Sequence, residues 1–234
     1  MHPKVVPLYR RWFRDEDHPY LVLDRLVAGH VDSQSVVLEI GCGRTAPLLR
    51  RLAPRARRVI GLDVVRFEAN PLMPLLSASA DAVPLAGNSI DLIFSRSVLE
   101  HIEHPARVFR EWQRLLRPGG RAIFLTPNLW DYASIGSALI PSALHPVLVQ
   151  RLEGRSPEDT FPTFYRANTS FRIRRLAREA GLNVERLEHL GQYPSYLTFH
   201  PIPFALGTGY SRLVGLHGLR QLRPWLLASL TKSS

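Results

Sequence analysis

Cysteine is almost absent from this 234-residue chain, because Cys42 is the only one. A single cysteine cannot form an internal disulfide, so a hydrophobic core has to hold the fold together, and a reducing compartment suits the composition. Hydrophobic residues make up 45% of the sequence and charged residues 21%, which is enough apolar material for one substantial core. We expect residues 1–234 to form a single domain with insertions.

Long apolar runs are missing as well. The best candidate for a membrane-spanning helix, residues 138–149, is too short and is interrupted by Pro141 and Pro146. The beginning of the sequence does not resemble a secretory signal, because three arginines and three acids fall between Arg10 and Asp17. We therefore expect a cytoplasmic protein.

Lysine is also scarce, since Lys4 and Lys232 are the only two, and nearly all of the formal net charge of +10 comes from arginine. Such an excess favours an anionic partner, which could be a phosphorylated substrate, an acidic lipid surface or RNA. The arginines are spread along the chain instead of forming one basic tail. This distribution argues against nucleic acid as the main partner without excluding it.

Short apolar runs rich in β-branched residues alternate with helical patterns in the first two thirds of the chain. Buried strands are predicted at residues 36–40, 59–62, 90–94 and 122–125, with later strands at 183–190 and 225–231. Helices are predicted at residues 18–30, from about 46 with Thr45 as the cap, at 106–116 and at 169–180. This alternation predicts an α/β fold with a doubly wound, mostly parallel sheet.

Two stretches, residues 129–165 and 193–222, fit no regular element well and are rich in aromatic residues. Ligands of doubly wound sheets lie beyond the carboxyl ends of the strands. We expect both insertions to form a cap there, on the side where a substrate would bind.

A glycine-rich turn, Gly41-Cys42-Gly43, joins the first strand to the following helix. Glycine allows a sharp turn and a close approach to a ligand, while the helix start offers free N–H groups. Asp63 follows the next strand, twenty residues beyond Gly43, where a carboxylate can accept hydrogen bonds from ribose hydroxyls. The sequence therefore predicts a nucleoside-binding loop.

The loop alone leaves alternatives open. Gly41, Gly43 and Ala46 also satisfy the dinucleotide pattern G-x-G-x-x-G/A, and the glycines could serve the turn only. Glu39, just ahead of the glycines, is unfavourable near a pyrophosphate. An acid there suits S-adenosylmethionine (SAM), which lacks phosphate and carries an ammonium and a sulfonium.

Four further motifs follow in order: DAVPL at residues 81–85, NSIDLIFS at 88–95, VLEHI at 98–102 and LRPGG at 116–120. With the loop, they resemble the class I SAM-dependent methyltransferases of the type 11 group, which includes enzymes of quinone, glycan and lipid assembly. The resemblance covers residues 36–128, roughly two-fifths of the chain. It implies a Rossmann-like seven-stranded sheet whose last strand runs antiparallel.

The resemblance also assigns site residues. It implies that Glu39 and Gly41 lie near the methionine end of SAM and that Cys42 and Gly43 complete the loop. Asp63 would bind the ribose. The remaining cofactor residues would be Asp81 and the Ala82 backbone at the adenine, and Ser95 beside the cofactor. One departure is Thr45, which stands where the family often has a third glycine.

His101 is the candidate catalytic base, because it follows the fourth strand and an imidazole titrates near neutral pH. The alternative is a histidine that packs a helix start or binds a loop carbonyl. Related ubiquinone-pathway enzymes carry an additional acid three residues before the Glu-His pair, and here that position is Ser97. Because this ligand is missing, we expect no metal.

The acceptor is expected to be a small molecule or a lipid-linked compound. The base-stacking Asn/Asp-Pro-Pro-aromatic motif is missing at residues 95–98. A nucleic-acid methyltransferase, an NAD-dependent oxidoreductase and a catalytically silent SAM-binding protein remain alternatives. Apolar residues in both insertions, flanked by arginines, favour peripheral contact with an anionic membrane. The two insertions could instead bury these residues against each other.

Overall fold

The computed structural model describes residues 1–65, 74–131 and 161–234. Its centre is a seven-stranded sheet with the order β3-β2-β1-β4-β5-β7-β6. The strands are β1 (Val36–Ile40), β2 (Arg58–Asp63), β3 (Leu75–Ser77), β4 (Ile90–Arg96), β5 (Leu116–Pro127), β6 (Leu182–Leu190) and β7 (Trp225–Lys232).

The pairing confirms the expected Rossmann-like methyltransferase sheet. β3, β2, β1, β4 and β5 run parallel to one another, whereas β7 is antiparallel to both β5 and β6. The chain order reverses between β1 and β4, since β2 and β3 lie on one side of β1 and β4 lies on the other. Ligands of doubly wound sheets bind at such a switch point, which here is the end of the glycine-rich turn.

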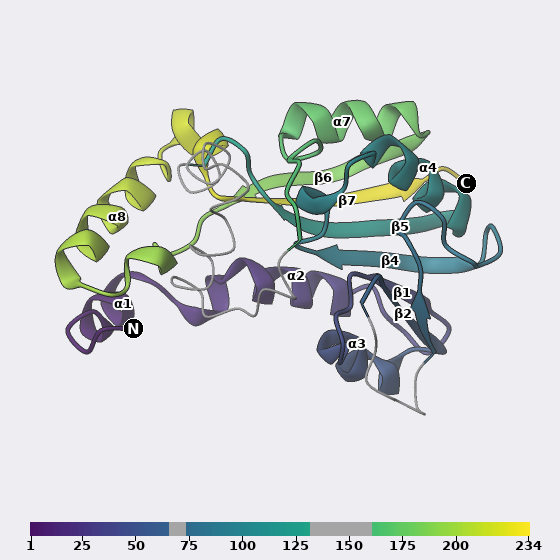
Figure 1. Cartoon of the computed structure of the whole chain (residues 1–234), viewed down its shortest axis with the longest axis horizontal. Coiled ribbons are helices and arrows are strands. Elements are labelled where there is room, and N and C mark those ends of the chain that lie inside the picture. Colours follow the sequence, from purple (N-terminus) through teal and green to yellow (C-terminus); the bar gives the residue numbers. More distant parts are fainter. Residues whose placement is uncertain (66–73, 132–160) are drawn as a thin grey trace.

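Helices cover both faces of the sheet (Figure 1). The helices that do so are α2 (Pro19–Ala28), α3 (Pro47–Leu52), α4 (Pro105–Leu115) and α7 (Ser170–Glu179), whereas α1 (Val6–Trp12) and α8 (Pro201–Leu213) lie beyond one end of the strands. One core cluster joins α4 and α7 to a face of the sheet, and a second joins α2 and α3 to the other. None of the helices in the described ranges is long and apolar enough to cross a membrane.

Helix α4 shows how the sequence builds these layers. Pro105 opens it, a position where the missing N–H costs no helical hydrogen bond. Four apolar side chains then recur at spacings of three and four residues, and all are buried: Val108, Phe109, Trp112 and Leu115. Burying each contributes roughly 1.5–3 kcal/mol, so packing on the sheet fixes this helix.

Several sequence predictions need correction. The cap of α3 is Ala46, with a positive φ of 45° and no side-chain hydrogen bond, so Thr45 does not cap that helix. β3 and α1 were not expected. Within residues 193–222, which were expected to be irregular, the structure forms the 13-residue helix α8. Most of the other insertion, residues 132–160, lies outside the described residues.

Helix α8, within the second insertion, lies toward the carboxyl ends of the parallel strands, while its role as a cap over a substrate site stays a prediction. In Figure 1 the strand β4 points toward the end of the molecule that carries α1 and α8. Residues 161–165 also belong to this end, because the backbone N–H groups of Phe164 and Tyr165 donate to the carbonyl of Glu100, shortly after β4. The carboxyl edge of the sheet is therefore covered by the N-terminal arm, residues 161–165 and α8.

Candidate cofactor and active site

The glycine-rich turn is held tightly against the neighbouring strand. The backbone N–H groups of Gly41 and Cys42 donate to the carbonyl of Leu62 at 2.8 and 3.2 Å. Gly41 has a φ of +76°, and a Cβ there would lie 2.2 Å from a methyl carbon of Val98. Only glycine fits this position, because any side chain would meet both strain and a clash.

Asp63, at the end of β2, faces the same turn. Its carboxylate accepts hydrogen bonds from the backbone N–H groups of Gly43 and Val64, both at 2.7 Å. A Cβ on Gly43 would meet nothing within 4 Å, so open space lies beside the turn. A fixed carboxylate next to open space can accept hydrogen bonds from the hydroxyls of a ribose.

Glu39 is buried at the carboxyl end of β1, with 3% of its surface exposed. Burial raises the pKa of its carboxyl to about 8, while the positive charge of Arg96 and a backbone hydrogen bond from Leu49 lower it in part. One carboxylate oxygen, Oε2, has no hydrogen-bond partner. A buried acid with an unpartnered oxygen is costly unless a cation or donor meets it, so this site fits an ammonium group.

Ser95 lies on β4 next to the end of β1, since its partner in the sheet is Ile40. Its side chain is 1% exposed, and its hydroxyl also lacks a hydrogen-bond partner. Two orphaned polar atoms, on Glu39 and Ser95, thus occur at the ends of neighbouring strands. Their positions fit the methionine end of SAM.

Sequence reasoning missed a cation at this edge. The guanidinium carbon of Arg96 lies 4.6 Å from the centre of the Tyr20 ring, and one of its nitrogens lies 3.7 Å from the Asp24 carboxylate. Arg96 therefore adds a positive charge near Glu39, as its influence on the Glu39 pKa indicates. A carboxylate and a guanidinium placed together can bind the ammonium and the carboxylate of an amino acid. The local sequence carries no signal for this placement of Arg96, because it depends on how α2 packs against β4.

The residues expected at the adenine lie in the loop after β3. The Asp81 carboxylate accepts a hydrogen bond of 2.5 Å from the Ser79 hydroxyl and lies 4.0 Å from Arg107. The backbone N–H of Ala82 donates to the Ser79 carbonyl at 3.1 Å. The loop thus uses these groups internally in this structure, and the adenine contact stays a prediction.

Cys42 points into the core instead of toward the open side of the turn. Its side chain is 3% exposed and belongs to the cluster of α2 and α3. Burial raises the pKa of its thiol to about 12. A contribution of Cys42 to cofactor binding would therefore come from its backbone.

His101 lies in a short 3₁₀ helix (Leu99–His101) after β4. Its Nδ1 lies 2.9 Å from the carbonyl oxygen of Pro162, which can only accept, so Nδ1 carries the hydrogen. Its Nε2 faces the buried carboxylate of Glu100 at 4.0 Å. The Phe161 ring meets the imidazole edge-on at 6.0 Å between centroids. This arrangement fixes the tautomer and the ring orientation.

Glu100 is itself oriented by a chain of buried polar groups. Asn168 donates to the hydroxyl of Thr126 at 2.7 Å, and that hydroxyl donates to Glu100 at 3.2 Å. These contacts connect the segment just before α7 with β5 and the 3₁₀ helix that contains His101. They hold the Glu100 carboxylate beside Nε2 of His101.

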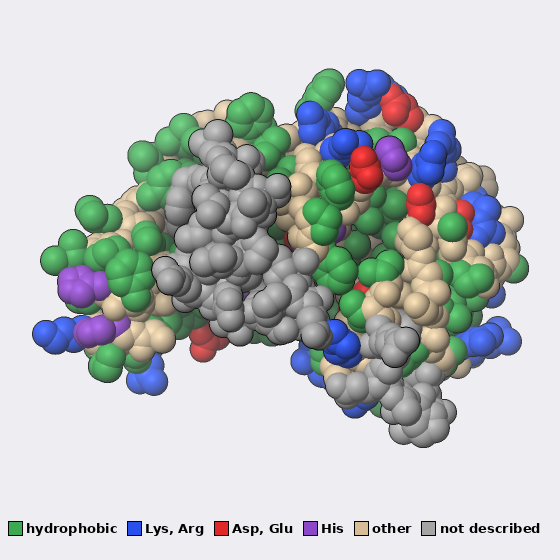
Figure 2. Space-filling view, in the orientation of Figure 1, with side chains coloured by type: hydrophobic (Ala, Val, Ile, Leu, Met, Phe, Trp, Pro, Cys, Tyr) green, Lys and Arg blue, Asp and Glu red, His purple; other side chains and the backbone are tan. Residues whose placement is uncertain are grey.

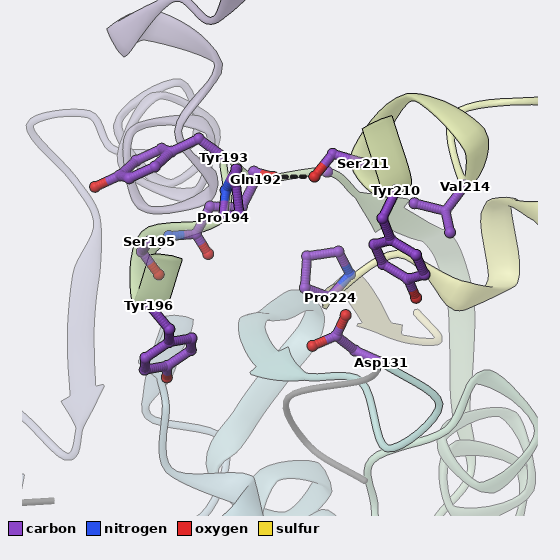
Figure 3. Close-up of a pocket in the computed structure, with 11 residues that line it drawn as sticks. Asp131, Gln192, Tyr193, Pro194, Ser195, Tyr196, Tyr210, Ser211, Val214 and Pro224 are labelled. Carbon is purple, nitrogen blue, oxygen red and sulfur yellow. Dashed lines mark hydrogen bonds between the residues drawn. The ribbon is translucent and has the colours of Figure 1, made fainter. Parts of the chain in front are cut away.

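A small cavity of about 40 Å³ lies on the cap side, between the end of β6 and α8 (Figure 3). Tyr193, Tyr196 and Tyr210 line it together with residues of the 191–195 turn and with Asp131 and Pro224. The Ser211 hydroxyl donates to the Gln192 carbonyl at 3.3 Å and ties α8 to that turn. Pockets for small organic ligands have volumes of roughly 300–1,000 Å³, so this cavity is too small to hold one in the conformation described.

Comparison with known proteins agrees with this geometry. A family model described as a methyltransferase domain matches residues 38–124. A Mycolicibacterium smegmatis protein named as an S-adenosylmethionine-dependent methyltransferase is 36% identical over 125 residues, covering 50% of this chain and 46% of the relative. A tRNA U34 carboxymethyltransferase of Saccharophagus degradans is 31% identical over 124 residues, 48% of this chain and 38% of the relative.

Among solved structures, an S-adenosylmethionine dependent methyltransferase from Mesorhizobium loti has a TM-score of 0.57 and 20% identity. That comparison covers 91% of this chain and 97% of the other, so the two share a fold. The matches to the two sequence relatives, in contrast, span less than half of the length of those proteins.

Proposed function

We propose that this chain transfers a methyl group from SAM to a small-molecule or lipid-linked acceptor, because residues 38–124 match a methyltransferase-domain family model and the same region is similar to a SAM-dependent methyltransferase. The observation that carries the proposal is the pair formed by Asp63 and Glu39 around the glycine-rich turn. One carboxylate faces open space beside Gly43, and the other has an unpartnered oxygen in a buried site.

SAM, when bound, supplies a methyl carbon that is activated by a positively charged sulfur. The chain's own groups would bind the two ends of the molecule. Asp63 would accept hydrogen bonds from the ribose hydroxyls, and Glu39 would bind the ammonium group of the methionine part of SAM. Ser95 would also contact the methionine part, and Arg96 would bind its carboxylate. Asp81 and Ala82 would contact the adenine.

His101 is proposed as the general base. With Nδ1 hydrogen-bonded to the Pro162 carbonyl, the proton from the acceptor would go to Nε2, beside the carboxylate of Glu100. A positioned base contributes typically 10²–10⁴-fold to a proton-transfer step. A purely structural histidine would make the same Nδ1 contact, so the two roles are separated by turnover and not by geometry.

The acceptor is proposed to enter from the cap side and to be apolar or lipid-linked. The aromatic residues Tyr193 and Tyr210 lie on that side, and so do the exposed apolar residues of α8. A cytoplasmic enzyme in peripheral contact with a membrane would meet such an acceptor at the bilayer surface. This contact is developed below.

A tRNA acceptor is the second candidate. It is favoured by the similarity to the tRNA U34 carboxymethyltransferase and by the formal charge of +10. Phosphate contacts would make RNA binding strongly salt-dependent.

Calorimetry with SAM and with NAD tests the cofactor first, and we expect heat of binding with SAM alone. Cell extracts are then incubated with the enzyme and SAM labelled in the methyl group. Label in an organic-solvent extract supports a lipid-linked acceptor, whereas label in RNA supports the second candidate. Absence of SAM binding would refute both.

A further inference from the structure

Helix α8 has apolar residues on the side that faces solvent. Its buried residues are Phe204, Gly207 and Thr208, which leave the opposite side open. There Ile202 is 65% exposed, Leu206 73% and Leu213 51%. Spacings of four and seven residues place these three side chains on one stripe of the helix. A helix that is apolar on both sides needs a second apolar environment.

The stripe continues beyond both ends of the helix. Phe199, just before α8, is 64% exposed, and Leu216, just after it, is 59% exposed. Figure 2 shows the resulting gathering of hydrophobic side chains at the left end of the molecule, where Figure 1 places α1 and α8. We call Phe199, Ile202, Leu206, Leu213 and Leu216 the α8 stripe.

The inner side of α8 is packed tightly against the rest of the protein. Phe204, on the inner side of α8, is fully buried and meets Phe13 of the N-terminal arm edge-on, at 6.1 Å between ring centroids. A Cβ on Gly207 would lie 2.7 Å from both Leu197 and Pro194, so the helix backbone lies close to the preceding turn. This packing holds the helix in an orientation that leaves the stripe outward.

The segments around the stripe carry an excess of positive charge, although Asp15, Glu16 and Asp17 directly follow the N-terminal arm and Arg14 lies 3.5 Å from Glu16. Residues 1–14 and 191–223 contain no aspartate or glutamate. Their exposed cations include Lys4, Arg10, Arg11, Arg14, Arg212 and Arg220. The N-terminal arm lies beside α8, because the Arg212 guanidinium stacks over the Trp12 ring at 5.1 Å and the His2 N–H donates to the Thr198 carbonyl at 2.8 Å. One end of the molecule is therefore both apolar and cationic.

We propose that the α8 stripe and the arginines of the N-terminal arm dock this protein onto an anionic membrane surface. Apolar side chains beside clustered arginines are the combination by which a monotopic helix inserts between headgroups and binds acidic lipid. A second copy of the chain fits less well, because a symmetric contact would bring the same cations face to face.

Docking in this way would also orient the enzyme. The α8 stripe belongs to the cap at the carboxyl edge of the sheet, the edge that also carries Glu39, Asp63 and His101. The site would thus open toward the bilayer, which suits a lipid-linked acceptor. This orientation rests on the proposed function, whereas the docking itself does not.

Flotation with vesicles tests the proposal. The full chain is mixed at low salt with vesicles of phosphatidylcholine alone or of phosphatidylcholine with phosphatidylserine. We expect binding to the mixed vesicles, weakened by added salt. Replacing Ile202 and Leu206 together by serine should lower the affinity by at least about tenfold. The change Phe171→Ser is the matched control, because Phe171 is 73% exposed but lies on α7, outside the α8 stripe.

The charge contribution is tested separately. Replacing Arg10 and Arg11 by glutamine should weaken binding to the mixed vesicles by about fivefold for each arginine. SAM binding by calorimetry should stay unchanged in every variant, which verifies that each one is folded. It also separates a failure of docking from a failure of the proposed function.

Three results would overturn the proposal. The first is the absence of flotation with mixed vesicles at low salt, and the second is flotation that the serine variant leaves unchanged. The third is a dimer in light scattering that the serine variant converts to monomer, since a second copy would then occupy the stripe.

Discussion

Replacing Glu39 by glutamine should stabilise the folded protein and at the same time weaken SAM binding. The carboxyl is 3% exposed, and burial raises its pKa from 4.5 to about 8. The folded protein without SAM therefore favours the protonated acid. Glutamine has nearly the same shape and no charge, so Glu39→Gln keeps the favoured form at every pH.

The magnitude follows from the pKa. Each unit of pKa corresponds to about 1.4 kcal/mol, so the change from 4.5 to about 8 corresponds to at most about 5 kcal/mol. The folded pKa lies above the unfolded one, so this stability is present below pH 4.5 and is lost as the pH rises through about 8. Other carboxylates titrate in both proteins, and only the difference between wild type and variant reports on Glu39.

Urea unfolding of the protein without SAM between pH 5 and pH 9 measures this difference. We expect Glu39→Gln to gain stability over wild type across that interval, by about 2–5 kcal/mol at the upper end. Calorimetry then compares SAM with 5′-methylthioadenosine, which lacks the amino-acid part. The variant should bind SAM at least about tenfold more weakly, because a charge-assisted contact is lost, and 5′-methylthioadenosine equally well. Equal loss for both ligands, or a stability difference that does not grow with pH, would refute this account of Glu39.

Three further variants and one control test the remaining site. Asp63→Ala should weaken SAM binding by about 2–4 kcal/mol. The control Asp91→Ala, which removes a carboxylate bound to Arg117, should lower thermal stability only. If Asp63→Ala binds SAM within threefold of wild type, Asp63 is excluded from the ribose site. His101→Ala should reduce turnover by about 10²–10⁴-fold with SAM affinity intact, and full turnover with a lower melting temperature would make His101 structural. Gly41→Ala should destabilise the protein by about 1–3 kcal/mol, because a Cβ would lie 2.2 Å from Val98 at a positive φ; unfolding at the wild-type urea concentration would contradict this.

The parts of the fold that local pattern determines were predictable. β1 and β4 are buried on both faces, and such strands appear in the sequence as continuous apolar runs. β3 has three residues and none of them is buried, so it gave no comparable pattern. Helix α8 was missed because two glycines and two prolines interrupt its sequence, and because its apolar residues occupy two faces instead of one.

Some residues of the site could likewise be predicted from a local motif, whereas others depend on tertiary packing. The glycines, Glu39 and Asp63 occur at fixed spacings around one turn, so a motif reveals them. Arg96 was missed, because its position depends on how α2 packs against the sheet: Tyr20, beneath its guanidinium, also meets Ser97, 77 residues away in the sequence. The adenine contacts of Asp81 and Ala82 were assigned by resemblance and stay a prediction, since in this structure the Ala82 N–H donates to the Ser79 carbonyl.

The position of β7 has a consequence for how the chain folds. β7 lies between β5 and β6, although it follows both of them in the sequence, and β7 is the only strand that β6 pairs with in the described sheet. During synthesis, residues 182–190 would leave the ribosome with no strand to pair with until residues 225–232 follow. An unpaired strand edge is prone to aggregation, so the interval between the two strands is the vulnerable stage. A chain truncated before Trp225 should lose β6 from the sheet as well as β7.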